Sequence, residues 1–528
     1  MKIPVFDWLF RIGNSLLNFT KTTTKNSDIY KNYFSSYIMK KVVVIGSGFA
    51  GLSSAAYLSK EGFDVTVVEK NKQIGGRARN YKANGYTFDM GPSWYWMPEI
   101  FDNFFNSFNY KTKDFYELIK LDPGFKIVFD NSEMILPANW NEICDLFDSY
   151  EENGAKKLNK FMDDAEKKYT IGLRFLYNSP GISITELLKK DVLLNASKLQ
   201  LLTSYRKHIK RHFNDPRLIS LLEFPVLFLG TSAESAPALY SLMAYSGIKQ
   251  GTFYPMGGFA KVIESMAEIC KNNGVKFLLD EQVTKINIFN KTVKSVTTRM
   301  QELPADFVVG AADYAHIESK LLDTKYQNYN SAYWESREFS PSALLFYLGV
   351  NKKLKNLEHH TLFFDEDMEK LSQEIYDTKV WPEKPLFYTC CPAKSEENLA
   401  PKGKENLFIL MPISAGLEDT EELREKYFQI ILKRLERYCK EDIISNIEYK
   451  KSYCIKNFEE DYFAFKGNAY GLANTLLQTA NLKPKIKNNK VNNLFYCGQL
   501  TVPGPGVPPS IISGKLVAEQ IINSYSKK

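Results

Sequence analysis

The sequence contains no apolar run long enough to cross a bilayer. Its longest candidate, residues 218–230, is interrupted by Glu223 and Pro225, whereas a spanning helix needs about 20 consecutive apolar residues. Basic segments interleaved with aromatic residues are also missing, so nucleic acid is not expected as a partner. Internal repeats and low-complexity tracts are absent. The 528 residues, 44% hydrophobic and 24% charged, instead have a globular composition, and their number favours two domains.

Cysteine and histidine are scarce and scattered. The seven cysteines are odd in number and show no C-x-x-C spacing, which favours a reduced, cytoplasmic compartment over a disulfide framework. Among the five histidines, His208 and His212 have the i,i+4 spacing of one helical face. No third ligand of metal-site spacing accompanies them. We therefore expect packing or surface roles for this pair, and no metal site.

The charge balance is mildly basic, with a net charge of +7 and an isoelectric point near 8.7. Such a surface is either simply solvated or attracted to anionic lipid. Residues 1–38 precede the first predicted strand, and their apolar residues fall near one helical face. Two interpretations stay open: an interfacial amphipathic helix, or an untranslated stretch before a natural start at Met39. The segment does not have the pattern of a signal peptide.

A glycine-rich motif follows the first predicted strand. Residues 41–51 read as a strand, a turn containing Gly46 and Gly48, and the start of a helix that includes Gly51. Gly46 makes the tight turn, Gly48 lets a pyrophosphate approach the backbone, and Gly51 lets the helix pack closely on the strand. Glu69 ends the next strand, where its carboxylate can accept hydrogen bonds from ribose hydroxyls. The motif predicts a dinucleotide site at the helix N-terminus. The alternative is a glycine-rich turn in an ordinary βαβ unit.

Two further blocks extend this motif. Residues 75–79 add a second glycine pair and Arg77, which can bind phosphate in a fork geometry. Near the C-terminus, a short buried strand over 493–497 leads into a Pro/Gly stretch, 503–510, and an apolar helical pattern to Ile522. The N-terminus of that helix would stabilise negative charge on a reduced flavin ring. The alternatives are a turn with solvated arginines and a rigid loop before a terminal helix.

These blocks together resemble the bacterial phytoene desaturases, carotenoid-forming members of the FAD-dependent amine-oxidase-like superfamily. The resemblance runs from about residue 40 to the end. It rests on residues 44–52, Glu69, 75–78, 88–92, 253–258, 359–361 and 493–514. Two departures concern the substrate more than the flavin: the tail 498–504 lacks the histidine that this family often has there, and Lys483-Pro484 replaces the family's Arg-Pro.

The resemblance implies a set of site residues. Trp94 and Trp96 are candidates for the wall of a substrate tunnel, and His359 is a candidate either for substrate contact or for a structural hydrogen bond. No residue can be named as the proton acceptor. The residues expected to bind FAD are Gly46, Ser47, Gly48, Ala50, Gly51, Glu69, Lys70, Gly76, Arg77, Gly91, Pro92, Ser93, Val283, Gly498, Gly506 and Val507.

The expected fold is α/β, with a Rossmann-type FAD-binding domain assembled from separated segments. Residues 39–110, 251–320 and 483–528 would form this domain. Residues 111–250 and 321–482 would form a mixed α+β substrate domain with a helical, membrane-facing part. The segment after the strand 306–309 lacks a second set of glycines, so a separate nicotinamide site is not expected.

The function implied by the resemblance is desaturation of phytoene to lycopene. Successive hydride transfers to FAD, each followed by loss of a proton, would introduce the double bonds. The protein would work at the cytoplasmic face of the inner membrane, with a long-chain carotenoid as substrate and oxygen or a quinone as electron acceptor. The alternatives are a desaturase of C30 or hydroxylated or methoxylated carotenoids, a redox-neutral carotenoid isomerase, and a non-catalytic carrier of isoprenoid lipids.

Overall fold

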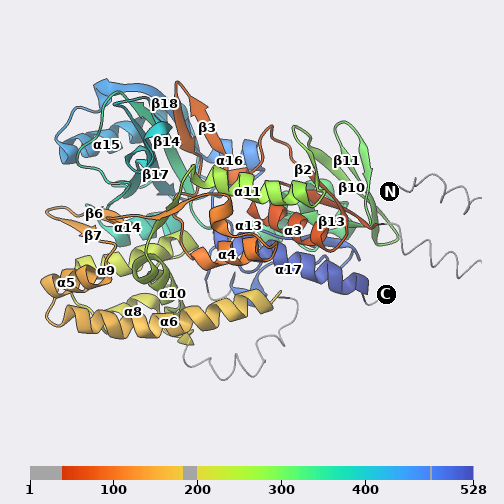
Figure 1. Ribbon diagram of the computed structural model, residues 1–528, viewed down its shortest axis with the longest axis horizontal. Coiled ribbons are helices and arrows are strands. Elements are labelled where there is room, and N and C mark those ends of the chain that lie inside the picture. Colours follow the sequence, from red (N-terminus) through yellow and green to blue (C-terminus); the bar gives the residue numbers. More distant parts are fainter. Residues whose placement is uncertain (1–38, 182–198, 476–477, 527–528) are drawn as a thin grey trace, which may run out of the picture. The chain divides into compact units, whose positions relative to one another are not determined.

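The computed structural model describes residues 39–181, 199–475 and 478–526. The extension 1–38, for which we predicted an amphipathic helix or an untranslated stretch, lies outside the described residues. The described residues from Lys41 onwards form one compact unit (Figure 1). The main hydrophobic core includes residues from both predicted domains, such as Val44 and Leu345. The boundaries between those domains therefore stay a prediction.

A parallel five-stranded sheet lies at the centre of the nucleotide-binding half. Its strands come from distant parts of the chain, as the discontinuous assembly requires. In spatial order they are β19 (Leu494–Tyr496), β13 (Phe307–Gly310), β1 (Lys41–Ile45), β2 (Asp64–Val68) and β9 (Lys276–Leu278). The Val-rich strands are almost fully buried, as is typical of a parallel sheet covered on both faces.

Three helices pack near this sheet (Figure 1). Helix α3 (Phe49–Lys60) follows β1, and both α11 (Gly258–Asn272) and the C-terminal α17 (Val507–Ser526) contact it. The contact between α17 and α3 is close, because a Cβ added at Gly514 would lie 2.3 Å from the carbonyl oxygen of Ala50. The end of the chain therefore packs directly on its first helix.

A mixed seven-stranded sheet forms the second half. Its strand order is β18 (Ile447–Tyr453), β14 (Ser342–Val350), β17 (Glu405–Ile413), β16 (Phe387–Cys390), β15 (His360–Phe363), β6 (Phe125–Val128) and β7 (Glu133–Leu136). All nine residues of β14 are buried, and Phe346 on one face packs against Phe428 of α15 (Glu421–Cys439). The apolar runs at 343–350 and 407–412 thus form neighbouring central strands.

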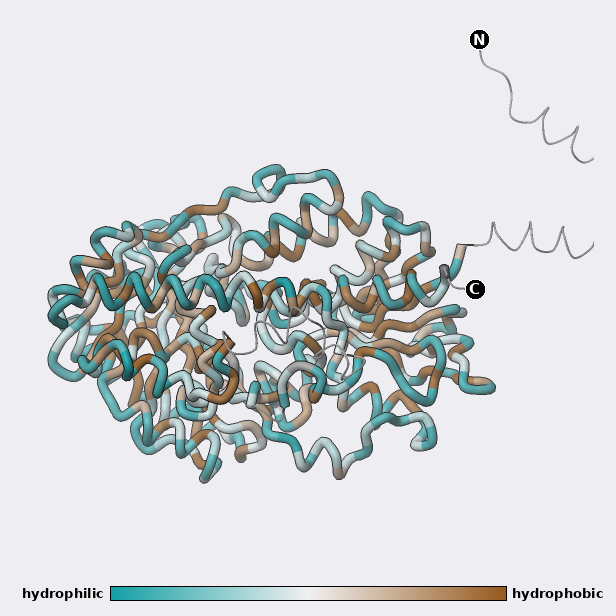
Figure 2. The backbone as a smooth tube through the Cα atoms, turned by 90° about the horizontal axis from the view of Figure 1, so that it is seen from below, coloured by the Kyte–Doolittle hydropathy of each residue, from teal (hydrophilic) through white to brown (hydrophobic). Residues whose placement is uncertain are grey.

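Smaller sheets and helices complete the described chain. In Figure 2 the outer helices are largely hydrophilic, and the hydrophobic segments lie mostly between them. No described helix combines the length and the apolar character needed to cross a bilayer. The remaining strands are β3 (Asn80–Ala83), β4 (Tyr86–Asp89), β5 (Leu118–Lys120), β8 (Phe253–Pro255), β10 (Val283–Phe289), β11 (Thr292–Thr298) and β12 (Glu302–Pro304). The remaining α-helices are α4 (Pro98–Asn106), α5 (Trp140–Tyr150), α6 (Gly154–Asn178), α8 (Tyr205–Lys210), α9 (Pro216–Glu223), α10 (Ser241–Ala244), α12 (Tyr314–His316), α13 (Ser331–Glu335), α14 (Met368–Gln373) and α16 (Ile455–Tyr462).

Candidate flavin site

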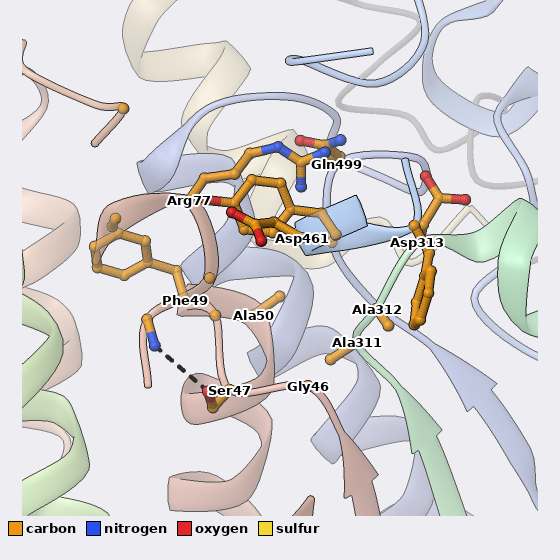
Figure 3. A pocket seen from close by; sticks show the side chains of 18 of the residues that line it. Gly46, Ser47, Phe49, Ala50, Arg77, Ala311, Ala312, Asp313, Asp461 and Gln499 are labelled. Carbon is orange, nitrogen blue, oxygen red and sulfur yellow. Dashed lines mark hydrogen bonds between the residues drawn. The ribbon is translucent and has the colours of Figure 1, made fainter. Parts of the chain in front are cut away.

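A large cavity opens at the carboxyl edge of the five-stranded sheet, where parallel α/β sheets bind ligands. Figure 3 shows the turn that carries Gly46, Ser47 and Ala50, together with Arg77, around this space. The cavity collects residues from segments more than 400 positions apart. The predicted residues that line it are Gly46, Ser47, Gly48, Ala50, Glu69, Lys70, Gly76, Arg77, Gly91, Pro92, Val283, Gly498, Gly506 and Val507.

Of the three glycines in the first motif, only Gly48 has open space beside it for a ligand. A Cβ on Gly48 would meet no protein atom within 4 Å, and this glycine lines the cavity. A Cβ on Gly51 would lie 2.1 Å from the carbonyl oxygen of Gly46. Gly46 itself has a φ of +105°, in the region that favours glycine. The two outer glycines therefore shape the turn, and Gly48 keeps its cavity side open.

Glu69 holds this turn from the end of β2. Its Oε2 accepts hydrogen bonds from the Ser47 backbone N–H at 3.0 Å and from Ser47 Oγ at 2.7 Å. Its Oε1 accepts two more from Asn71, at 2.9 Å from the backbone and 3.0 Å from the side chain. The buried carboxylate is thereby fixed at the cavity wall. Its predicted contact with ribose hydroxyls stays a prediction.

The second glycine pair lies against the first. A Cβ on Gly76 would lie 3.5 Å from Gly48 Cα, so the two turns touch. Arg77 extends beside Tyr462, with its guanidinium carbon 4.7 Å from the ring centroid, and donates to the carbonyl oxygen of Asn468 at 3.1 Å. Its Nε is buried and has no hydrogen-bond partner among the described residues. A buried donor without a partner is costly, which makes Arg77 available to an anionic ligand.

Five of the predicted site residues do not line the cavity. Gly51 lies beneath the turn, as described above. Ser93 donates to or accepts from the Tyr388 hydroxyl at 2.9 Å. Trp94 stacks on the His360 ring, with centroids 4.2 Å apart. Trp96, which is buried, donates to Thr252 Oγ1 at 3.1 Å.

The fifth residue, His359, is also buried, and its Nδ1 lies 2.7 Å from Ser395 Oγ. Of its two predicted roles, the structure contains the hydrogen bond. Trp94, Trp96 and His359 thus belong to the packed interior beside the cavity. They are absent from the wall of the flavin cavity, and the place of the two tryptophans along a substrate tunnel stays a prediction.

Other lining residues were not selected from the sequence. Ala311, Ala312 and Asp313 follow β13 at the same sheet edge as the glycine turn. Burial raises the pKa of Asp313 to about 6, against the opposing effects of backbone N–H donors and Arg77. These three residues could have been predicted to line the site from their place directly after β13, because the carboxyl ends of parallel strands lie at the same edge of a sheet.

The end of α16 also reaches the cavity, with Asp461, Tyr462 and Phe463. Asp461 pairs with Arg79, and Phe463 lies under the Lys70 ammonium, 3.8 Å from the ring centroid. Lys70 also donates to the carbonyl oxygen of Glu460. No motif marks this segment in the sequence, so only the fold could reveal it.

The cavity has an apolar end as well. Ala343 and Leu345 of β14 and Phe408 and Leu410 of β17 line it from the seven-stranded sheet. Leu345 and Leu410 lie opposite each other in the register of the two strands. One cavity therefore joins a polar end at the glycine turn to an apolar end at the second sheet.

Comparison with known proteins agrees with this architecture. The family described as flavin-containing amine oxidoreductases matches residues 49–522. The chain belongs to this family. It is also 36% identical, over 92% of its own length and 98% of the relative's, to a carotenoid 3,4-desaturase of Haloarcula japonica. A zeta-carotene-forming phytoene desaturase of Myxococcus xanthus is 27% identical, over 92% and 94% of the two chains. The chain therefore belongs to the carotenoid desaturase group of this flavoprotein family, and FAD is its cofactor.

Solved structures share the fold. An oxidoreductase from Methanosarcina mazei superposes with a TM-score of 0.58 at 17% identity, covering 91% of this chain and all of the other. Cyclohexylamine oxidase from Brevibacterium oxydans gives a TM-score of 0.56 at 14% identity, covering 93% of this chain and all of the other. The α/β fold expected from the sequence is thereby confirmed.

The residues of this chain fit FAD. The open side of Gly48, the buried Nε of Arg77 and the N-terminus of α3 all meet at the cavity. Within the described parts of the chain no side chain caps that N-terminus, so its N–H groups are available to phosphate oxygens. The N-terminal residue of α17, Val507, also lines the cavity.

Proposed function

We propose that this protein desaturates phytoene to lycopene. The observation that supports the proposal is the continuous cavity with a nucleotide-binding end and an apolar end. A substrate that is a long hydrocarbon needs no charged recognition group. It needs an apolar surface beside the reacting ring of the cofactor.

The apolar end supplies such a surface. The four lining residues from β14 and β17 are Ala343, Leu345, Phe408 and Leu410. They are aliphatic or aromatic, and they belong to the two longest strands of the seven-stranded sheet, in which most residues are buried. Strand side chains have little freedom in such a packed sheet. This wall would therefore hold a polyene in a fixed position and keep water out.

Bound FAD supplies a hydride acceptor. The chain's own contribution is to orient the cofactor through the glycine turn and Arg77, and to position the C–H bond of the substrate through the apolar wall. We propose a peripheral location at the cytoplasmic face of the inner membrane, because the substrate itself dissolves in lipid. The proposed electron acceptor is oxygen or a quinone.

A second candidate function is 3,4-desaturation of a carotenoid that is already conjugated. One observation favours it: the relative from Haloarcula japonica carries that activity in its name and is 36% identical. The relatives named phytoene desaturases are 27% and 29% identical. Both candidates use the same flavin site and differ only in the substrate that enters the apolar end.

The test is pigment analysis in two bacterial hosts, one that accumulates phytoene and one that accumulates lycopene. Lycopene formed in the first host would support the proposal. No change in the first host, together with a more conjugated product in the second, would favour 3,4-desaturation instead. Unchanged pigments in both hosts would contradict both candidates.

A flavin-site variant provides the control for this test. Glu69→Ala removes the carboxylate that holds the glycine turn, so we expect it to lose FAD and to leave the pigments unchanged. Product formation by this variant at the wild-type level would show that the pigments change without the flavin site.

A further inference from the structure

Three buried side chains outside the flavin cavity place potential metal-ligating atoms close together. One ligand atom from each of His359, His360 and Cys390 lies within 4.8 Å of the other two. Their exposed fractions are 5%, 0% and 4%, and none of them lines the flavin cavity. No metal site was expected from the sequence, where only His208 and His212 were considered as a ligand pair. Two adjacent histidines and a cysteine 30 residues later match no standard ligand spacing.

The sheet register brings the cysteine to the histidines. Strands β15 and β16 pair antiparallel, with His360 directly opposite Cys390. Residues opposite each other in this way carry their side chains on the same face. Tyr388, two residues before Cys390, shares that face. The neighbouring His359 is held to β16 through its carbonyl oxygen, which accepts the Cys391 N–H at 2.8 Å.

Each histidine ring is fixed by a hydroxyl group on one nitrogen. His359 Nδ1 lies 2.7 Å from Ser395 Oγ, and His360 Nδ1 lies 2.6 Å from the Tyr388 hydroxyl. Histidines that bind metals are usually oriented in this way, through a hydrogen bond on the nitrogen that does not bind. The ring positions are therefore set before any ligand arrives.

The other nitrogen of each ring has no partner. His359 Nε2 and His360 Nε2 are both buried and accept or donate no hydrogen bond among the described residues. A single buried nitrogen of this kind is uncommon, and two in adjacent residues need an explanation. A neutral imidazole offers the lone pair of such a nitrogen to a cation.

The chemistry of the three groups selects a class of ion. Imidazole and thiolate together suit soft or borderline cations such as Zn²⁺ and Cu⁺, whereas Mg²⁺ and Ca²⁺ prefer oxygen ligands. Binding would replace the Cys390 thiol proton by the metal and release that proton to solvent, with no change of oxidation state. The thiolate would neutralise Cu⁺ completely.

We propose that His359, His360 and Cys390 form a binding site for one thiophilic metal ion, Zn²⁺ or Cu⁺. The ion joins β15 to β16 on the face against which Trp94 stacks. Trp94 lies two residues after Pro92, which lines the flavin cavity. The site therefore stabilises the wall behind the cofactor and takes no part in the redox reaction.

The direct test is the metal content of the full-length, flavin-loaded protein, expressed with added zinc or with added copper and purified without a histidine tag. Elemental analysis is expected to find about one Zn²⁺ or Cu⁺ per chain, because a closed site of protein ligands retains its ion. X-ray absorption at the edge of that metal is expected to show one sulfur and two nitrogen ligands. The two media distinguish the two ions.

Two cysteine variants provide a matched comparison. Cys390→Ser is expected to lower the metal content at least about ten-fold, since hard oxygen replaces the soft ligand. Cys391→Ser alters the next residue, which is equally buried and lies outside the cluster, and is expected to keep the ion. Flavin absorbance of each variant checks that the fold is intact.

Several results would overturn the proposal. Wild-type protein from both media with less than about a tenth of an ion per chain would do so, since retained metal is the expectation for a closed site. Metal retained in Cys390→Ser would place the ion elsewhere. If that variant does not fold, a wild-type absorption spectrum without a sulfur ligand would decide against the site.

Discussion

The two large sheets contribute to one cavity in different ways. The half of the molecule around the five-stranded sheet lines the cavity largely with backbone atoms, which come from the glycine turn, helix N-termini and the closely packed second glycine pair. The seven-stranded sheet offers side chains from β14 and β17. Backbone recognition tolerates few residue types, because any Cβ either clashes or fills the space for the ligand. An apolar wall accepts many residues of suitable size. The first surface therefore leaves a sequence motif and the second does not.

The largest effect is expected from an alanine beneath the glycine turn. A Cβ at Gly51 would lie 2.1 Å from the Gly46 carbonyl oxygen, so α3 would have to move away from β1. We expect Gly51→Ala to destabilise the fold by about 3 kcal/mol or more and to abolish FAD retention. Thermal melting and flavin absorbance measure the two effects.

The matched variant is Gly48→Ala, three residues earlier. Its Cβ meets no protein atom within 4 Å, so the melting temperature of the apoprotein should stay near that of the wild type. The methyl group enters the cavity, and FAD affinity should fall about ten- to a hundred-fold, equivalent to about 1.4–2.8 kcal/mol. If both variants lost stability equally, the distinction between turn-shaping and ligand-facing glycines would be wrong.

An effect that depends on pH is expected at a buried lysine shortly before β19. Lys483 is buried, and its Nζ has no hydrogen-bond partner among the described residues. Burial lowers the pKa of Lys483 from 10.5 to about 7. Between those two pH values the unfolded chain binds more protons than the folded chain, so stability rises with pH across this window. The free-energy cost at pH 7 is on the order of a few kcal/mol.

Replacing Lys483 by an uncharged residue should remove this dependence of folding stability on pH. Lys483→Met is expected to melt at a higher temperature than the wild type at pH 7, and the difference should shrink towards pH 10. Lys490→Met, at an exposed position, is the control and should change little at either pH. If Lys483→Met raised the melting temperature by the same amount at both pH values, the lysine would not be neutral in the folded protein.

The smallest effect on the protein is expected at the apolar wall. Leu410 lines the cavity opposite Leu345. Leu410→Trp should leave FAD content unchanged and lower carotenoid turnover about ten-fold, because a displaced substrate no longer meets the ring in a reactive geometry. Leu410→Met keeps the volume and should behave as the wild type. Loss of FAD in the tryptophan variant would mean that this wall belongs to the cofactor.

The sequence predicted the nucleotide-binding half well, for a physical reason. Tight turns and close backbone approaches require glycine, and Gly46, Gly48 and Gly51 therefore stand at positions where other residues fail. This pattern predicted a dinucleotide site, and the α/β fold and FAD that the family resemblance implied are confirmed. The place of β14 and β17 beside the cofactor, in contrast, was not predicted.

Other parts of the site were not accessible from the sequence. Asp461, Tyr462 and Phe463 reach the cavity only because α16 ends there, and no local pattern encodes that meeting. Trp94 and Trp96 were assigned to the substrate wall because of their proximity in sequence to Pro92. The structure places Trp94 against His360 and Trp96 against Thr252, outside the flavin cavity, and their contact with substrate stays a prediction.

The order of strands in the parallel sheet has a consequence for biosynthesis. Strand β1 is translated among the first described residues, yet its neighbour β13 comes some 260 residues later and the outer strand β19 almost at the end. Contacts so distant along the chain form slowly. On the ribosome, the unfinished polypeptide must wait with an open sheet edge, a state prone to aggregation. Flavin capture can then be completed only after release of the C-terminal helix, so a chain truncated before residue 494 would be degraded or aggregate without ever binding its cofactor.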